Sequence, residues 1–287
     1  MKDITELDLK ERIPLAARRA DDQTTIVRVG ATSVGGKNLT MIAGPCAVES
    51  REQVLDIARN VKRLGATMLR GGAYKPLTFP YRTASTFELK EPGLEYLAEA
   101  GRAVGLPVVT EVVDVRLVAQ VASYADVLQI GARNMQNFPL LEEVGRADKP
   151  VLLKRHFGCS LRDWLGAAEY ILHGGNPNVI LCERGVAAAH THEPTSRFIV
   201  DIQAVPAVRE YSHLPVIVDP SHSTFKRRYV APVARAAIAA GADGIIIDVH
   251  PQPEKAAVDP LQALNYEAFD QLMTELRGIA AVLGRSL

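Results

Sequence analysis

Residues 216–222 read Val-Ile-Val-Asp-Pro-Ser-His, a short apolar run that ends in a carboxylate and an imidazole. Runs of this kind, each followed by a polar or charged cluster, occur eight times, at 39–43, 66–69, 107–109, 126–130, 151–153, 179–181, 216–218 and 244–247. The clusters contain Cys46, Arg70 and Lys75, Glu111, Arg133, Lys154, Glu183 and Arg184, Asp219 and His222, then Asp248, His250 and Asp259. Loops after the strands of an α/β barrel meet on one face, so the pattern predicts a barrel with an active site on its rim.

Amphipathic helical patterns separate the apolar runs. Residues 51–64 place five apolar side chains on one stripe, with Ser50 as a candidate N-cap. Further helices are predicted at 91–104, 115–123, 139–145, 160–172, 199–210, 229–240 and 266–283. Eight alternating units, without a Gly-x-Gly-x-x-Gly turn after the first strand, favour a closed (β/α)₈ TIM barrel over an open α/β sheet.

The residues before the first barrel strand predict a short extension. Residues 1–22 are polar and without a clear period, which indicates an arm or a short helix. Residues 24–28 alternate branched and polar side chains, and 30–36 are rich in turn formers, which predicts a β-hairpin that caps the barrel floor. We therefore expect an arm and hairpin at 1–38, a catalytic barrel at 39–287, and no separate regulatory domain.

The composition excludes some classes of partner. The 33 basic and 33 acidic residues balance, so no global field draws the chain to nucleic acid or an anionic membrane. The chain opens with mixed charge, and no run reaches the roughly 18 apolar residues of a membrane span. Cys46, Cys159 and Cys182 form neither a Cys-x-x-Cys pair nor an even disulfide framework. These features predict a cytoplasmic protein with free thiols and small-molecule partners.

Five cations follow four strands of the predicted barrel, two of them after the second strand. They are Arg70, Lys75, Arg133, Lys154 and Arg184. Like charges on one rim repel each other, so this set predicts an anionic ligand, and guanidinium groups favour carboxylate or phosphate oxygens. Any one cation could instead pair with a carboxylate such as Glu111 or Glu183. That alternative does not account for all five.

A second cluster offers metal-ligand chemistry. Cys46, His222, Asp248 and Asp259 follow strands one, seven and eight, and thiolate, imidazole and carboxylate are ligands of borderline divalent cations. His250 and Asp219 are rival ligands, and Cys46 alone could be a small core residue. A further set, His190, His192 and Glu193, is predicted to decorate a loop rather than to bind metal.

Several segments, in this order, resemble the metal-dependent 3-deoxy-D-arabino-heptulosonate 7-phosphate (DAHP) synthases, in particular the compact type I-beta branch related to 3-deoxy-D-manno-octulosonate 8-phosphate synthase. The resemblance runs from about residue 24 to the C-terminus. It is carried by Ile42-Ala43-Gly44-Pro45-Cys46 with Glu49, and by residues 70–76, 131–134, 153–155, 180–185, 218–222, 250–251 and 254–255.

The resemblance implies a (β/α)₈ enzyme that condenses phosphoenolpyruvate with erythrose 4-phosphate, giving DAHP and phosphate. This is the first step of the shikimate pathway of aromatic amino acid biosynthesis. It implies that phosphoenolpyruvate is held by Arg70, Lys75, Arg133, Lys154 and Arg184, with Lys75, His222 and Cys46 as catalytic residues. It implies a divalent ion, Mn²⁺, Fe²⁺, Co²⁺ or Zn²⁺, on Cys46, His222, Asp248 and Asp259. The implied assembly is a homotetramer or a homodimer.

The acceptor half of the resemblance is implied by Pro76, Leu77, Thr78, Phe79, Arg155, His156 and Asp219. Leu77 and Phe79 replace an Arg and a Ser of the family's Lys-Pro-Arg-Thr-Ser segment. His156 and Phe157 replace a Gly and a Met, and Asp248 replaces a Glu among the metal ligands. These changes predict a less anionic, more aromatic acceptor pocket.

Three functions therefore remain open from the sequence. The first is DAHP synthase itself. The second is a divergent phosphoenolpyruvate-dependent synthase with a different aldehyde acceptor, which the residues at 77 and 79 favour. The third is a ligand-binding paralogue without turnover, which the shortened Asp248 favours, although such a protein has little physical reason to maintain five convergent cations.

Overall fold

The structure is a computed structural model of the 287-residue chain, and it describes residues 6–75, 88–189 and 197–287. Eight parallel strands form a closed barrel in the order β10-β3-β4-β5-β6-β7-β8-β9. They are β3 (Thr40–Gly44), β4 (Met68–Arg70), β5 (Val108–Glu111), β6 (Val127–Ile130), β7 (Val151–Lys154), β8 (Val179–Glu183), β9 (Val216–Val218) and β10 (Gly244–Asp248). The last strand, β10, pairs with the first barrel strand, β3, through five aligned residues. The prediction of a closed TIM barrel is confirmed.

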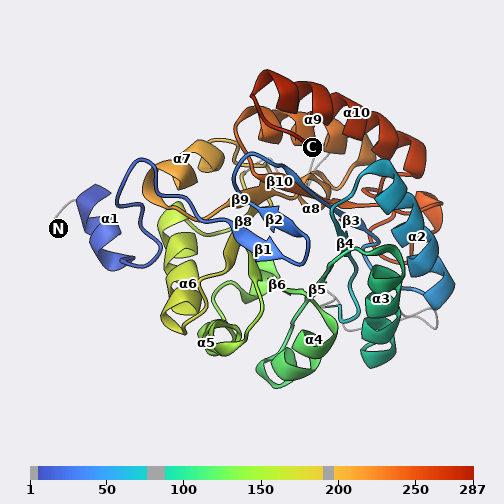
Figure 1. The fold of residues 1–287 in the computed structure, drawn as a ribbon, viewed down its shortest axis with the longest axis horizontal. Helices are drawn as coiled ribbons and strands as arrows, with labels where there is room; N and C mark the ends of the chain where they lie inside the picture. Colours follow the sequence, from blue (N-terminus) through green and yellow to red (C-terminus); the bar gives the residue numbers. More distant parts are fainter. Residues whose placement is uncertain (1–5, 76–87, 190–196) are drawn as a thin grey trace.

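Helices cover the outside of the barrel (Figure 1). They are α2 (Arg51–Leu64), α3 (Glu91–Val104), α4 (Val118–Tyr124), α5 (Phe138–Arg146), α6 (Leu161–His173), α7 (Ala204–Tyr211), α9 (Arg227–Ala239) and α10 (Tyr266–Val282). Helix α2 begins as the sequence predicts, because the Ser50 side chain accepts a hydrogen bond from the amide of Gln53. It ends at Gly65, which is in the left-handed conformation.

Two helices begin several residues later in the chain than the sequence predicts. Residues 115–117 form a 3₁₀ turn, η1 (Val115–Leu117), before α4, with Asp114 accepting a hydrogen bond from the amide of Arg116. Helix α7 begins at Ala204 rather than at residue 199, because Ile199 pairs with Val186 in an antiparallel bridge. The apolar residues at 199–202 therefore precede the helix, and the first of them belongs to a β-bridge.

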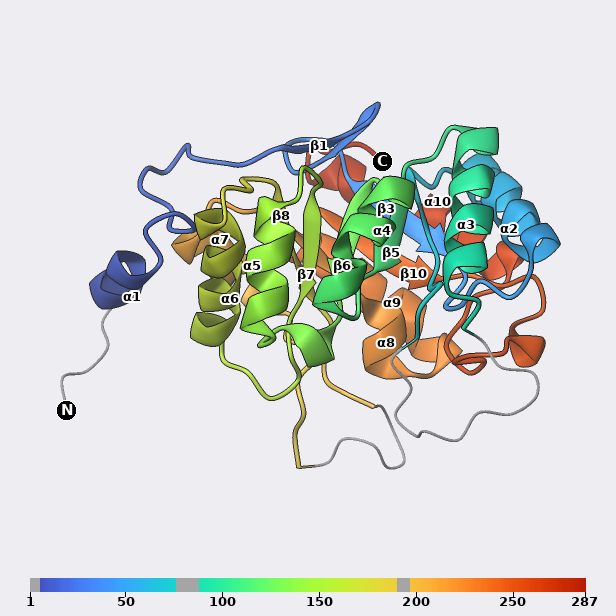
Figure 2. The same cartoon turned by 90° about the horizontal axis from the view of Figure 1, so that it is seen from below.

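The N-terminal extension contains the short helix α1 (Glu6–Arg12) and the antiparallel pair β1 (Val27–Val29) and β2 (Thr32–Val34). Val27, Val29 and Val34 join the apolar side chains that fill the barrel interior, among them Ile42 and Ile246. Figure 2 shows β1 at one end of the barrel and α8 (Pro220–Thr224) at the other. The predicted hairpin on the barrel floor is present, and its second strand lies within the segment expected to be a turn.

Among the described residues, no helix has the length and apolar character needed to cross a membrane.

Candidate active site and metal centre

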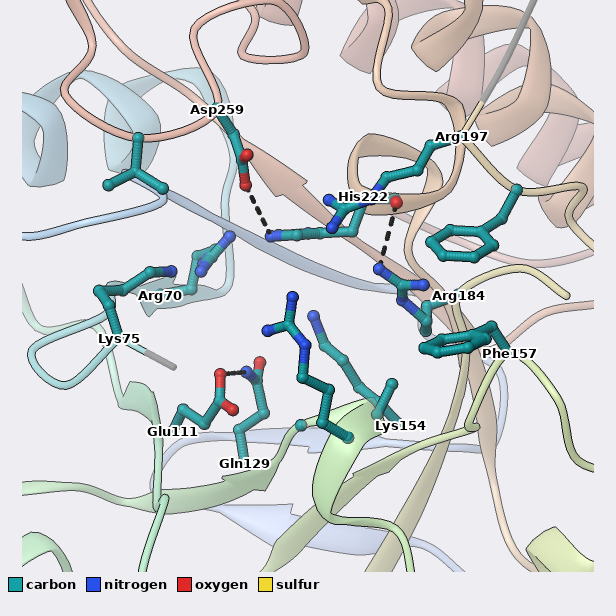
Figure 3. Close-up of a pocket in the computed structure, with 15 residues that line it drawn as sticks. Arg70, Lys75, Glu111, Gln129, Lys154, Phe157, Arg184, Arg197, His222 and Asp259 are labelled. Atoms are coloured by element: carbon teal, nitrogen blue, oxygen red, sulfur yellow. Dashed lines mark hydrogen bonds and ion pairs between the residues drawn. The ribbon is translucent and has the colours of Figure 1, made fainter. Parts of the chain in front are cut away.

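A polar pocket lies at the carboxyl ends of the barrel strands (Figure 3). Its walls are Arg70, Lys75, Glu111, Gln129, Gly131, Ala132, Arg133, Lys154, Phe157, Arg184, Arg197, Phe198, His222, Val258 and Asp259. The structure therefore brings together the five cations that the sequence placed on one rim. It adds to them part of the cysteine, histidine and aspartate cluster.

Three of the pocket cations are deeply buried. Arg70 and Lys154 are each 4% exposed and Arg184 is 7% exposed. Arg184 Nη2 donates a hydrogen bond to the carbonyl of His222 at 3.3 Å, while Arg184 Nη1 is buried without a hydrogen-bond partner in the described chain. A buried donor without a partner costs free energy, so an anionic ligand would stabilise this guanidinium.

The counter-ions of these cations are aspartates. Arg70 pairs with Asp248, and Lys154 Nζ lies 2.5 Å from Asp219 Oδ2. The carboxylates that the sequence offered as alternatives have other partners. Glu111 accepts a hydrogen bond from Gln129 at 3.2 Å (Figure 3), and Glu183 pairs with Arg155 at 3.0 Å.

Four candidate metal ligands converge beside the cations. The ligand atoms of Cys46, His222, Asp248 and Asp259 all lie within 4.8 Å of one another. Cys46 Sγ is 3.4 Å from Asp259 Oδ2 and 3.8 Å from His222 Nε2, and His222 Nε2 is 3.6 Å from Asp248 Oδ2. Bonds of about 2.0–2.3 Å to a tetrahedral ion place ligands about 3.3–3.7 Å apart. The four residues therefore fit a divalent ion without large movement.

The surroundings of His222 suit a neutral imidazole ligand. Burial lowers the pKa of His222 to about 3, although the carboxylate of Asp219 acts in the opposite direction. His222 Nδ1 lies 2.9 Å from Asp219 Oδ2, which fixes the ring and directs Nε2 toward Cys46, Asp248 and Asp259. A carboxylate behind a histidine is the usual arrangement at metal sites.

Lys75 connects the cations to the metal-ligand cluster. Its ammonium lies 3.2 Å from Cys46 Sγ and donates to the Cys46 carbonyl at 3.1 Å. Burial raises the pKa of the Cys46 thiol, and the charge of Lys75 opposes that rise. The ammonium therefore favours the thiolate, the form of cysteine that binds metal.

None of the residues predicted to bind the acceptor is among the described residues that line the pocket. Pro76, Leu77, Thr78 and Phe79 lie outside the described residues, as do His190, His192 and Glu193. Arg155 is directed away from the pocket lining, toward Glu183 at 3.0 Å and Asp201 at 2.9 Å. Asp219 is fully buried against Lys154 and His222.

His156 is also absent from the pocket lining, but it packs on a residue that is part of it. The His156 ring is 4.1 Å from the ring of Phe157, and Phe157 stacks on Phe198 at 5.1 Å. The rival ligands also lie apart from the metal cluster. His250 Nε2 is 3.7 Å from Glu49 Oε1. Asp219 contacts Nδ1 of His222, whereas the cluster surrounds Nε2 of the same ring.

Sequence reasoning missed several pocket residues. Gln129 is inside β6, where the apolar run concealed it, and Arg197 and Phe198 follow no apolar run at all. Arg197 and Phe198 reach the pocket because the Phe198 amide donates a hydrogen bond of 2.8 Å to the carbonyl of Ser223 in α8. No periodicity in the sequence signals such a long-range contact.

Comparisons with known proteins agree with this geometry. A sequence model described as the DAHP synthetase I family matches residues 20–281. A phospho-2-dehydro-3-deoxyheptonate aldolase from Thermotoga maritima is 48% identical over 270 residues, which cover 94% of this chain and 78% of that protein. A 2-dehydro-3-deoxyphosphooctonate aldolase from Syntrophobacter fumaroxidans is 30% identical over 88% of this chain and 90% of that protein.

Solved structures of DAHP synthases resemble this chain in their fold. The crystal structure of the Thermotoga maritima DAHP synthase superposes with a TM-score of 0.88 at 47% identity, covering 95% of this chain and 77% of that one. A truncated form of the Thermotoga maritima enzyme also gives a TM-score of 0.88, at 46% identity, covering 96% of this chain and 99% of that one. Because the matched sequence spans the barrel and the pocket together, the chain belongs to the DAHP synthetase I family.

Proposed function

We propose that this protein is a DAHP synthase, an enzyme that condenses phosphoenolpyruvate with erythrose 4-phosphate to give DAHP and phosphate at the start of the shikimate pathway. The observation that carries the proposal is one pocket in which five cations adjoin a Cys-His-Asp-Asp cluster. The 48% identical Thermotoga maritima aldolase supports it.

Phosphoenolpyruvate is assigned to the cations. It carries a carboxylate and a phosphate, and Arg70, Lys75, Arg133, Lys154 and Arg184 present ammonium and guanidinium groups to the same space. The unpartnered Nη1 of Arg184 supports this assignment, because a ligand oxygen would satisfy it. Buried cations such as these are already oriented, so they can stabilise charge that moves between carboxylate and phosphate during the reaction.

The metal is assigned to Cys46, His222, Asp248 and Asp259, and we propose Mn²⁺, Fe²⁺, Co²⁺ or Zn²⁺. A donor set of one sulfur, one nitrogen and two carboxylates suits these borderline ions. When bound, the metal supplies Lewis acidity toward the acceptor aldehyde or positions a water molecule.

The remaining chemistry uses the two substrates and the fixed charges. C3 of phosphoenolpyruvate attacks the aldehyde carbon, water adds at C2, and phosphate leaves by C–O cleavage. The Lys75 ammonium lies beside the Cys46 sulfur and lines the pocket, where it can favour the thiolate and donate a hydrogen bond to a reacting oxygen. By resemblance to the family we also infer assembly into a homodimer or homotetramer.

A second candidate is a synthase of the same type that uses a different aldehyde. The specific observation in its favour is the aromatic wall of the pocket, where Phe157 stacks on Phe198. An aromatic wall suits a less polar acceptor than a sugar phosphate.

The test is phosphate release from phosphoenolpyruvate with Mn²⁺, comparing erythrose 4-phosphate with no acceptor and with a panel of other aldehydes. We expect rapid release with erythrose 4-phosphate and formation of DAHP. Release with another aldehyde alone would establish the second candidate. No release with any acceptor would contradict both proposals and favour a protein that binds ligand without turnover.

A further inference from the structure

Arg197 is a sixth cation in the pocket wall, and none of the roles proposed above includes it. Its guanidinium lies 5.6 Å from the ring centre of Phe198 and 5.5 Å from that of Phe225. Within the described residues it makes no hydrogen bond and no ion pair. Two aromatic rings therefore hold the side chain in place, while its five N–H donors remain available.

Arg197 shares the pocket with two other parts of the site. Burial lowers the pKa of Arg184, and the charges of Arg197 and Arg133 lower it further. Arg197 lines the same pocket as Arg184, a deeply buried cation, and Asp259, a candidate metal ligand. Figure 3 shows its side chain beside His222, on the same side of the pocket.

Arg197 differs in depth from the buried cations. Arg70, Lys154 and Arg184 are at most 7% exposed, whereas Arg197 is half-buried. Both guanidinium groups lie against Phe198, because that of Arg184 is 4.5 Å from the centre of the same ring. The two guanidinium groups share one aromatic ring and cannot approach each other closely without repulsion, so the geometry offers two anion positions, one deep and one nearer the mouth.

We propose that Arg197 is a specificity-determining residue that binds the phosphate of the acceptor, and so supplies a guanidinium that the chain lacks at Leu77. This proposal rests on the proposed function. The acceptor aldehyde must meet phosphoenolpyruvate near the Cys-His-Asp-Asp cluster, and the other end of the acceptor then extends toward the mouth of the pocket. Arg197 lines the pocket together with His222 and Asp259 of that cluster, and it is half-buried.

Phosphoenolpyruvate does not need this residue. Five other cations already face its carboxylate and phosphate, and two of them, Arg70 and Arg184, have buried donors without a hydrogen-bond partner in the described chain. A second phosphate, by contrast, has no assigned cation among the described residues. The Phe157 and Phe198 rings then cover the carbon chain of the acceptor, which reconciles an aromatic wall with an anionic substrate.

The test measures binding rather than turnover. Erythritol 4-phosphate, which has the phosphate but no aldehyde, is titrated calorimetrically into the protein loaded with Mn²⁺ and phosphoenolpyruvate. Arg197→Met should weaken its binding roughly 10- to 100-fold, the range for loss of a charge-assisted hydrogen-bond donor. Arg197→Lys should bind with intermediate affinity, since it keeps the charge but loses the planar fork. The affinity for phosphoenolpyruvate should stay within about twofold in both variants.

Arg228→Met is the matched control, because Arg228 is also an arginine stacked on an aromatic ring, 4.9 Å from Tyr229, but it is not among the residues that line this pocket. It should bind both ligands like the unaltered protein. Unchanged affinity for erythritol 4-phosphate in Arg197→Met, an equal loss for phosphoenolpyruvate, or no binding to the unaltered protein would each overturn the proposal. Failure of the proposed function would instead appear as absent turnover of erythrose 4-phosphate by the unaltered protein.

Discussion

At the scale of single residues, the burial of Arg184 predicts a selective kinetic defect. Arg184→Ala removes a guanidinium that is 7% exposed and has one donor without a partner. We expect the KM for phosphoenolpyruvate to rise by about 10²-fold or more, as is typical when one partner of a buried charge interaction is lost. The KM for the aldehyde should change far less. Steady-state kinetics with each substrate varied in turn measures both values.

The control for this variant is Arg116→Ala, whose side chain is exposed and pairs with Asp114 two residues away. It should leave both KM values unchanged. Equal increases for phosphoenolpyruvate and aldehyde in Arg184→Ala would remove Arg184 from its assigned role.

A second residue-scale prediction concerns the buried ion pair between Lys154 and Asp219. Asp219→Asn leaves the Lys154 ammonium buried without a counter-ion, which should lower the free energy of unfolding by about 3–5 kcal/mol. The ordinary pKa of an aspartate in an unfolded chain is about 3.9, and in the folded protein His222 and Lys154 hold the pKa of Asp219 well below that value, against the effect of burial. The stabilisation is therefore present above about pH 5 and is lost as pH falls.

Urea unfolding at pH 7 and at pH 3.5 measures this difference between the unaltered protein and Asp219→Asn, which should be large at pH 7 and smaller at pH 3.5. Asp114→Asn is the control, because Arg116 also lowers the pKa of Asp114, to about 2, but that pair is exposed. It should have little effect on unfolding at either pH. A difference that does not depend on pH would contradict the assigned cause.

At the scale of elements, the floor hairpin depends on one glycine. Gly35 follows β2 with φ +100°, and a Cβ built there would lie 2.6 Å from the carbonyl oxygen of Thr25. Gly35→Ala should therefore destabilise the protein by about 1–3 kcal/mol or more, through backbone strain and the clash. Gly278→Ala, on the exposed side of α10 with no atom near the added Cβ, should instead stabilise by about 0.5–1 kcal/mol. Thermal and urea unfolding of the two variants provide the comparison, and effects of the same sign would contradict it.

The elements also show how far the sequence determines the fold. Each predicted apolar run overlaps a barrel strand, but several strands extend further than predicted. Arg70, Glu111, Lys154, Glu183 and Asp248 are the last residues of their strands, not the first residues of loops. A polar side chain at the rim can remain in the hydrogen-bonded ladder while it faces the pocket, so a hydrophobic pattern predicts the end of the strand one or two residues too early.

The candidate site is less predictable than the strands. The cations and the cluster around Cys46 could be found because each follows an apolar run. Arg155 follows the same kind of run, yet its guanidinium turns to Glu183 and Asp201, and the sequence contains no signal for that direction. Arg197 reaches the pocket only through contacts with the segment that contains Phe225. Such contacts depend on tertiary packing and not on local periodicity.

At the scale of the whole molecule, the candidate metal site lies across the seam that closes the barrel. Strand β10 pairs with β3 on one side and with β9 on the other. Cys46 follows β3, His222 is in α8 directly after β9, and Asp248 ends β10. A metal held by these residues would connect the first and last strands of the barrel. The metal would bind the folded chain much more strongly than the unfolded one, because only the fold brings the ligands together.

Metal binding should therefore raise the stability of the entire barrel. Added Mn²⁺ or Zn²⁺ at 100 times the dissociation constant should contribute about 2.7 kcal/mol to unfolding, and a chelator should remove that contribution. The measurement is the thermal midpoint as a function of metal concentration. Cys46→Ala should abolish most of the dependence, since it deletes the sulfur ligand. Cys159→Ala, which removes another buried thiol near His156 and away from the four ligands, should lower the midpoint slightly but keep the dependence. The same metal-induced shift in Cys46→Ala as in the unaltered protein would mean that the stabilising ion binds elsewhere.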